Sequence, residues 1–201
     1  MRATKRRKPV QRRSEEMVER ILDAATRVLE RDGYAQMSTN RVAAEAEVSI
    51  GSLYRYFADK DEIFETLRLR TSQVITDRVT EAMARSLGEE PYDAVRGVIA
   101  ALVDALRDQA AVARALINEV PLGAHTNTLP EIEQRLAQFT RIYAHQQLKG
   151  LDEAEIDARI YLAMAITLSS CLRIAFDAPP HLDSEHLIDT VAAMLAMGLT
   201  V

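Results

Sequence analysis

Helix-breaking residues are scarce in this chain and are confined to a few places. Its 201 residues include seven glycines and six prolines, while apolar residues make up 48%. Few apolar stretches alternate with a period of two, and Ala, Leu, Glu and Arg dominate, which together indicate mostly helix. A chain of this length can bury a substantial core. We therefore expect a folded all-α protein and exclude disordered and all-β proteins.

Capping residues and breakers divide the chain into helices. Ser14, followed by two acids, predicts the start of a first helix that ends at Asp32-Gly33. Two short helices follow, the first capped by Ser38 or Thr39 and the second by Ser49. A long helix starts at Asp59 and extends to about residue 87. The later breakers predict further helices over 91–119 with a break near Asp108, 130–149, 152–177 and 183–199.

Positive charge is concentrated at the N-terminus, although the whole chain carries a net charge of −5. Residues 1–13 contain seven basic residues and no acid, whereas the rest of the chain is acidic. Such an arm favours attraction to a polyanion at one end of the molecule, and a solubilising tail is the alternative.

We expect neither a membrane span nor a secretory signal. The longest strongly apolar uncharged stretch runs from Ile160 to Leu172 and is shorter than the roughly 20 residues that a span needs. The basic N-terminus is not followed by an apolar run, and the single Cys171 forbids an intramolecular disulfide. These features predict a protein of the reducing cytoplasm with no membrane partner.

The segment from Ser38 to Lys60 carries the strongest functional signal. At 100° per residue, Ile50, Leu53 and Phe57 share one face, which we expect to point inward. Small residues and a guanidinium occupy the opposite face, and tyrosines flank it: Gly51, Ser52, Tyr54, Arg55 and Tyr56. Such a face permits close approach to DNA and donation to a base edge or a phosphate. Two short helices behind a supporting helix predict a helix-turn-helix, with an ordinary helical hairpin as the alternative.

The run from Ser38 to Phe64 resembles the N-terminal signature of the TetR/AcrR family of transcriptional repressors. Its most specific part is V-S-x-G-x-L-Y-x-Y-F-x-x-K from Val48 to Lys60, and the similarity extends back to Ile21. One position departs from the family pattern, because Glu47 stands where the family usually has glycine. A glutamate there must adopt a left-handed conformation or alter the turn.

The resemblance implies a division into three parts and a function. We expect a basic flexible arm over 1–13, a helix-turn-helix DNA-binding domain over 14–65 with its motif near 38–57, and an effector-binding and dimerisation bundle over 66–201. The implied protein is a homodimeric, ligand-responsive repressor that a small-molecule effector releases from a palindromic operator in double-stranded DNA. The alternative is a helical small-molecule-binding or adaptor protein without operator binding. We expect no enzymatic activity and no cofactor.

By the same resemblance, DNA contacts fall on the two short helices and on the start of the next. These residues are Thr39, Asn40, Ser49, Ile50, Gly51, Ser52, Tyr54, Arg55, Tyr56 and Lys60. At Lys60 a free helix N-terminus and an ammonium together favour an anion. Residues 14–65 alone are net negative, so we expect the arm to contact phosphates or the adjacent minor groove through Lys5, Arg6, Arg7 and Arg12. The expected core residues are Val42, Ala46, Val48, Leu53 and Phe57.

The C-terminal bundle is expected to hold the effector and the dimer contact. Plausible pocket residues are Asn118, Glu119, Phe139, Tyr143, Met164 and Thr167. The resemblance places the dimer on the last two helices, as a four-helix bundle, with Ala163, Ser170, Val191, Met194, Leu195 and Gly198. A polar cluster over 181–186 contains two histidines and two acids, but Asp183 fits a helix cap and the histidines do not share a face. We therefore expect no metal site.

Overall fold

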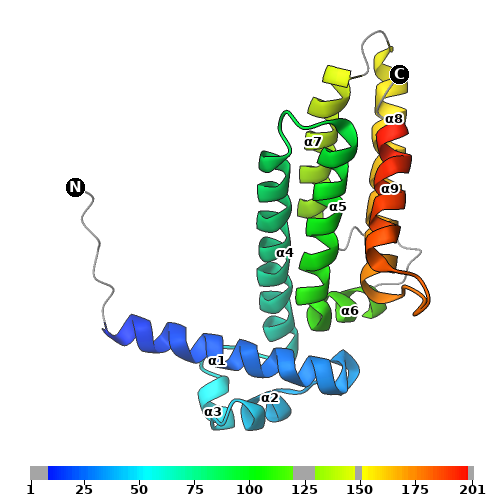
Figure 1. Ribbon diagram of the computed structural model, residues 1–201. Coiled ribbons are helices and arrows are strands. Elements are labelled where there is room, and N and C mark those ends of the chain that lie inside the picture. The colour runs from blue at the N-terminus through cyan, green and yellow to red at the C-terminus, as the bar shows by residue number, and fades with distance from the viewer. Residues whose placement is uncertain (1–8, 120–129, 148–150, 199–201) are drawn as a thin grey trace. The chain divides into compact units, whose positions relative to one another are not determined.

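A computed structural model describes residues 9–119, 130–147 and 151–198 of the chain. No strand occurs in these ranges, and the all-α fold is confirmed (Figure 1). The elements are α1 (Pro9–Asp32), the 3-10 turn η1 (Tyr34–Gln36), α2 (Thr39–Glu45), α3 (Ile50–Leu53), α4 (Lys60–Arg85), α5 (Pro91–Asp108), α6 (Ala110–Glu119), α7 (Pro130–Gln147), α8 (Glu153–Phe176) and α9 (Ser184–Gly198).

The helices lie close to the predicted ranges, with two differences. α1 begins at Pro9 rather than at Ser14, and an ion pair between Arg12 and Glu16 supports its early turns. The spacing of apolar residues predicted a helix that continues to Phe57, but α3 ends at Leu53. Turns follow it. The predicted break near Asp108 separates α5 from α6.

Contacts within the chain group its helices into two units. The first contains α1, α2, α3, the start of α4 and most of α6; the second contains the rest of α4, α5, α7, α8 and α9. The division inside α4 falls between Arg70 and Thr71, whereas the sequence placed it after residue 65. The grouping of Ala111–Glu119 with the N-terminal helices was not anticipated.

The first unit is held together by apolar side chains from each of its N-terminal helices. α1 packs against α2, and α2 packs against α3. Their buried core includes Ile21, Val28, Val42, Leu53 and Phe57. Helices as short as α2 and α3 are not stable alone, so this packing is what keeps them formed. Of the expected core residues, Val48 alone is only half-buried.

The second unit is a bundle in which α5 lies against α8 and α9, and α7 lies against α8 (Figure 1). Ion pairs also join α5 to α9: Arg96 donates to Asp189 at 2.7 Å and to Glu185 at 2.8 Å. Cys171 is fully buried in α8, and burial raises the pKa of its thiol to about 12. That thiol is therefore protonated and unreactive at neutral pH.

α8 meets the length and composition requirements of a membrane span, contrary to the expectation from the sequence. An 18-residue window in this 24-residue helix has a mean hydropathy of 1.4, and only 22% of that window is buried. Arginines flank the apolar stretch from Ile160 to Leu172, and the wider window can include them. One such helix is weak evidence for a membrane protein, because apolar helices of other proteins pass the same test.

Candidate nucleic-acid interface

The turn between α2 and α3 keeps a left-handed form although a glutamate occupies it. Glu47 has φ of 56° and is the only non-glycine residue with positive φ in the part of the chain that the structure describes. Its N–H donates to the Ala44 carbonyl at 3.1 Å, and the Val48 N–H donates to the Ala43 carbonyl at 3.0 Å. This is the Schellman pairing that ends many helices. The turn geometry is thus retained, with the strain that a side chain brings to a left-handed residue.

α3 is fixed by a cap at one end and by buried side chains at the other. The Ser49 hydroxyl accepts a hydrogen bond from the Ser52 N–H at 3.1 Å, and the two hydroxyl oxygens lie 2.8 Å apart. Leu53 is fully buried, and Phe57 after the helix is also buried. Because both anchors point inward, the residues between and beside them form an outward face.

The outward side of α3 and of the turn that follows it presents most of the side chains predicted to contact DNA. Tyr54 is 53% exposed, Arg55 and Gly51 are exposed, and Tyr56 is half-buried. Ile50 is 37% exposed, so the prediction that it faces inward is wrong. It is the first residue of α3, a helix of four residues in which Leu53 alone is buried.

The start of α2 approaches the end of α3 through a hydroxyl contact. Thr39 Oγ1 lies 3.2 Å from the Tyr54 hydroxyl, and the next residue, Asn40, is exposed. Ser38 caps α2 by accepting from the Arg41 N–H at 3.3 Å, which settles the choice between Ser38 and Thr39 as the cap. Thr39 is thereby left available to pair with the tyrosine.

The start of α4 is closed by a reciprocal cap next to Lys60. Asp59 Oδ1 accepts from the Glu62 N–H at 2.8 Å, and Glu62 Oε2 accepts from the Ala58 N–H at 2.6 Å. Within the described ranges, the ammonium of Lys60 and the guanidinium of Arg55 have no ion pair with a carboxylate. Both cations therefore remain available to an anion from outside the chain.

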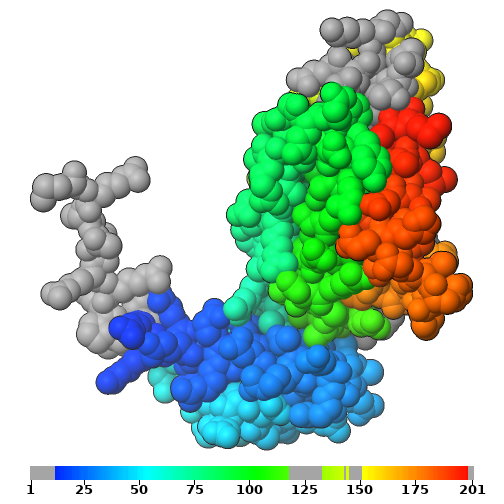
Figure 2. Space-filling model, viewed as in Figure 1, coloured from blue at the N-terminus to red at the C-terminus, as the bar shows by residue number. Residues whose placement is uncertain are grey.

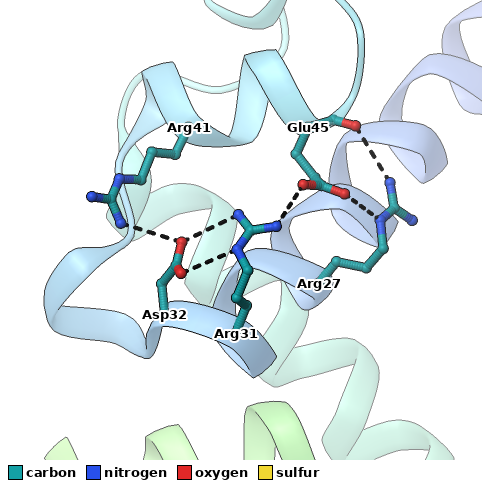
Figure 3. Close-up of polar contacts among 5 residues, drawn as sticks. All are labelled: Arg27, Arg31, Asp32, Arg41 and Glu45. Carbon is teal, nitrogen blue, oxygen red and sulfur yellow. Dashed lines mark hydrogen bonds and ion pairs between the residues drawn. The ribbon is translucent and has the colours of Figure 1, made fainter.

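Five charged side chains fasten α1 to α2 (Figure 3). Glu45 accepts from Arg27 at 2.8 Å and from Arg31 at 2.9 Å, and Asp32 accepts from Arg31 at 3.1 Å and from Arg41 at 3.2 Å. The hydrogen bond from Arg27 holds the pKa of Glu45 below its ordinary value, and that from Arg31 does the same for Asp32. This cluster was not predicted, although the excess of acids over 14–65 was a signal for it.

Three of the six predicted pocket residues share a cavity in the second unit. Phe139, Met164 and Thr167 line a space of about 40 Å³. Asn118 and Glu119 lie at the end of α6, which groups with the first unit. Their side chains and that of Tyr143 lie outside the described part. The other lining residues are Ala94, Val95, Val98, Ile99, Leu136, Thr140, Ala163 and Leu195.

The predicted dimer residues divide between this cavity and the surface. Ala163 and Leu195 line the cavity, while Ser170 and Val191 are half-buried. Met194 and Gly198 are exposed on α9, which forms part of the surface of its unit in Figure 2. Leu162, Ile166 and Met194 line a surface groove with Gly198, and Tyr161 and Met197 are exposed on the same two helices. We call these five apolar side chains the α8/α9 face.

The remaining predictions concern the arm and the polar cluster over 181–186. Lys5, Arg6 and Arg7 lie outside the described residues, and Arg12 is exposed on α1 and pairs with Glu16. In the cluster, Asp183 accepts from the His186 N–H at 2.9 Å as a helix cap. No group of three or more potential metal ligands occurs among the residues that the structure covers.

The fold and the site define a class of proteins: all-helical chains with a helix-turn-helix near the N-terminus. The family model described as bacterial regulatory proteins, tetR family, matches residues 21–67. The nucleoid occlusion factor SlmA of Pasteurella multocida is 30% identical over 135 residues, which cover 66% of this chain and 64% of SlmA. This chain thus spans somewhat less than two thirds of the length of that relative.

Two further comparisons cover more of the chain. An uncharacterized HTH-type transcriptional regulator of Mycobacterium tuberculosis is 29% identical over 147 residues, 72% of each chain. The crystal structure of a transcriptional regulator from Rhodococcus sp. Rha1 matches with a TM-score of 0.63 and 25% identity, covering 90% of this chain and 96% of that one. Over residues 21–67, the chain belongs to the TetR family of bacterial regulatory proteins.

Proposed function

We propose that the protein is a transcriptional regulator that inserts α3 into the major groove of double-stranded DNA. The observation that carries this proposal is that Tyr54 and Arg55, in the turn that follows α3, are exposed between the buried anchors Leu53 and Phe57. A recognition helix reads base edges from such a face. An arginine without a carboxylate partner can donate to a guanine edge or a phosphate.

The neighbouring polar groups fit contacts with the DNA backbone. We propose that Thr39, Asn40 and Tyr56 contact phosphates or the groove edge, and that Lys60 contacts a phosphate at the start of α4. The basic arm adds a further, sequence-independent attraction, because the helix-turn-helix is net negative without it.

We also propose a homodimer formed through the α8/α9 face. Exposed apolar side chains gathered on two neighbouring helices are favourable only when another surface covers them. A second copy of the chain supplies a self-complementary surface, and two recognition helices then read the two halves of a palindromic operator.

The cavity among α5, α7, α8 and α9 is where we propose that an effector binds. Binding there would release a repressor from DNA. The lining of the cavity is mainly apolar, which favours an effector with a substantial apolar part. Its volume of about 40 Å³ is far below the roughly 300–1,000 Å³ of typical ligand sites. An effector would therefore bind a conformation with more widely separated helices, and preferential binding to that conformation is what couples the effector to DNA release.

Selection from a random library of duplexes tests the proposed function. The purified protein is expected to enrich a palindromic sequence, and Arg55→Ala is expected to weaken binding to that duplex by roughly 5- to 150-fold. Arg85→Ala, which removes an exposed arginine from the second unit, is the matched control and should bind normally. If the folded protein enriches no sequence, the alternative of a small-molecule-binding or adaptor protein is favoured.

A further inference from the structure

Tyr34 contacts three residues at the start of α4. Its ring lies beneath the Lys60 ammonium, with Nζ 4.4 Å from the ring centroid. Its hydroxyl donates to Asp61 Oδ1 at 2.5 Å. The same ring packs against Phe64 with the two centroids 4.5 Å apart. Tyr34 belongs to the short turn η1 after α1, so α4 begins against a side chain from a distant part of the first unit.

The contact with the ring restrains Lys60 without occupying its hydrogen-bond donors. A cation over an aromatic face is attracted by the π electrons, so its N–H groups stay available to an acceptor on the other side. The hydroxyl of Tyr34 at the same time binds the carboxylate of Asp61, the acid next to Lys60 in sequence. Within the described ranges Lys60 has no ion pair, and it is only half-buried.

We propose that Tyr34 is a positioning residue that holds the Lys60 ammonium ready for a DNA backbone phosphate. Lysine side chains have many rotamers, and binding that orders one of them loses conformational entropy. A ring that orders Lys60 beforehand reduces this loss. The inference rests on the proposed DNA binding, and it assigns a role to Tyr34 that acts through Lys60.

The experiment measures affinity for a labelled random-sequence duplex over a range of salt concentrations, because a phosphate contact does not depend on sequence. The variants are Tyr34→Leu, which removes the ring, Tyr34→Phe, which keeps the ring and removes the hydroxyl, Lys60→Gln, and the double variant Tyr34→Leu/Lys60→Gln. Tyr92→Leu, on the second unit, is the matched tyrosine control. Thermal unfolding of each variant reports any loss of structure.

Tyr34→Leu is expected to bind about two- to tenfold more weakly, as loss of one ordered side chain predicts. Its salt slope should stay close to that of wild type, because Lys60 still forms its phosphate contact once bound, whereas Lys60→Gln loses one contact per protomer and its slope falls by about 0.9 for each. Tyr34→Phe, which keeps the ring, should bind the duplex like wild type. Removing the ring from Lys60→Gln should not weaken binding further. A merely structural tyrosine would change stability, and its loss would weaken binding by the same factor whether residue 60 is lysine or glutamine.

The results separate failure of the inference from failure of the proposed function. If wild type binds the duplex and Lys60→Gln lowers the slope, but folded Tyr34→Leu binds like wild type or loses the same factor in the Lys60→Gln background, Tyr34 does not position Lys60. Tighter binding by Tyr34→Leu would mean that the ring holds Lys60 back and would also overturn the inference. If wild type itself does not bind DNA, both the inference and the proposed function fail.

A second measurement uses the folded wild-type protein and so does not depend on variant stability. In NMR spectra, the Lys60 εCH₂ protons should resonate upfield of other lysines because of the ring current of Tyr34. The upfield shift should persist when the duplex is added. Its absence from the free protein, or its disappearance on binding, would overturn the inference.

Discussion

Glu45, the last residue of α2, accepts a hydrogen bond at 2.9 Å from Arg31 near the end of α1. Its other oxygen accepts from Arg27 at 2.8 Å, so one carboxylate joins two turns of α1 to α2. Single ion pairs at a surface stabilise a protein little, whereas a network with fixed geometry contributes more. Since α2 sets the position of α3, this carboxylate helps to fix the angle of the proposed recognition helix.

We predict that Glu45→Gln lowers the stability of the N-terminal unit at neutral pH and makes it less sensitive to acid. The folded-state pKa of Glu45 lies below its ordinary value of 4.5. The stabilisation is therefore present above that value and is lost as the pH falls through the folded pKa. Urea unfolding at pH 7 and below about pH 4 measures both effects. Glu30→Gln, an exposed acid on α1, is the control, and equal losses in the two variants would contradict the prediction.

Glu47→Gly is expected to stabilise the protein by about 0.5–1 kcal/mol. Glycine adopts the left-handed conformation of the turn without strain, although its greater freedom in the unfolded chain offsets part of the gain. Glu47→Ala removes the same charge but keeps a Cβ, so it isolates the backbone effect. The midpoint of thermal unfolding should rise for Glu47→Gly alone. A similar rise for both variants would show that the gain in stability comes from removing the negative charge.

Local signals in the sequence predicted most helix boundaries in this chain. Breakers and caps carry the information that starts and stops a helix, which is why the break near Asp108 and the cap at Ser49 were found. The side chain at Glu47 departs from the glycine pattern, but the Schellman hydrogen bonds use only backbone atoms. The turn therefore forms with a strained residue in it.

Features that depend on contacts distant in sequence were not predictable in the same way. Glu45 pairs with Arg27 and Arg31 across two helices, and Tyr34 reaches Lys60 only after α4 has packed. Ile50 shares a helical face with Leu53, but it is the first residue of a four-residue helix, and its burial depends on which other elements cover it. Periodicity reports which face is apolar, but not where a short helix stops.

The α8/α9 face gives a prediction about oligomeric state. Met194 is 67% exposed there, so a partner copy would bury it, and Met194→Glu would place a charge in that apolar contact. We expect wild type to sediment as a dimer and Met194→Glu to shift towards the monomer. The dissociation constant of the dimer should rise at least about tenfold. Leu87→Glu changes an equally exposed apolar residue outside this face and should remain dimeric. If both variants dimerise like wild type, another surface forms the dimer.

The small cavity of the second unit gives a prediction about the proposed effector site. Leu136 lines this space and is almost fully buried, so Leu136→Ala should destabilise the protein by about 2–5 kcal/mol and enlarge the cavity. A small apolar probe such as benzene fills an apolar cavity of adequate size and stabilises the state that binds it. Saturating benzene should therefore raise the unfolding temperature of Leu136→Ala more than that of wild type.

Leu106→Ala provides the comparison that decides whether the cavity itself matters. Leu106 is also almost fully buried in the second unit but does not line the cavity, so its removal leaves a void the size of one side chain. Leu136→Ala joins a void of similar size to an existing space of about 40 Å³. If benzene stabilises the two variants equally, the pre-existing space adds nothing to binding of the probe, and the prediction is wrong.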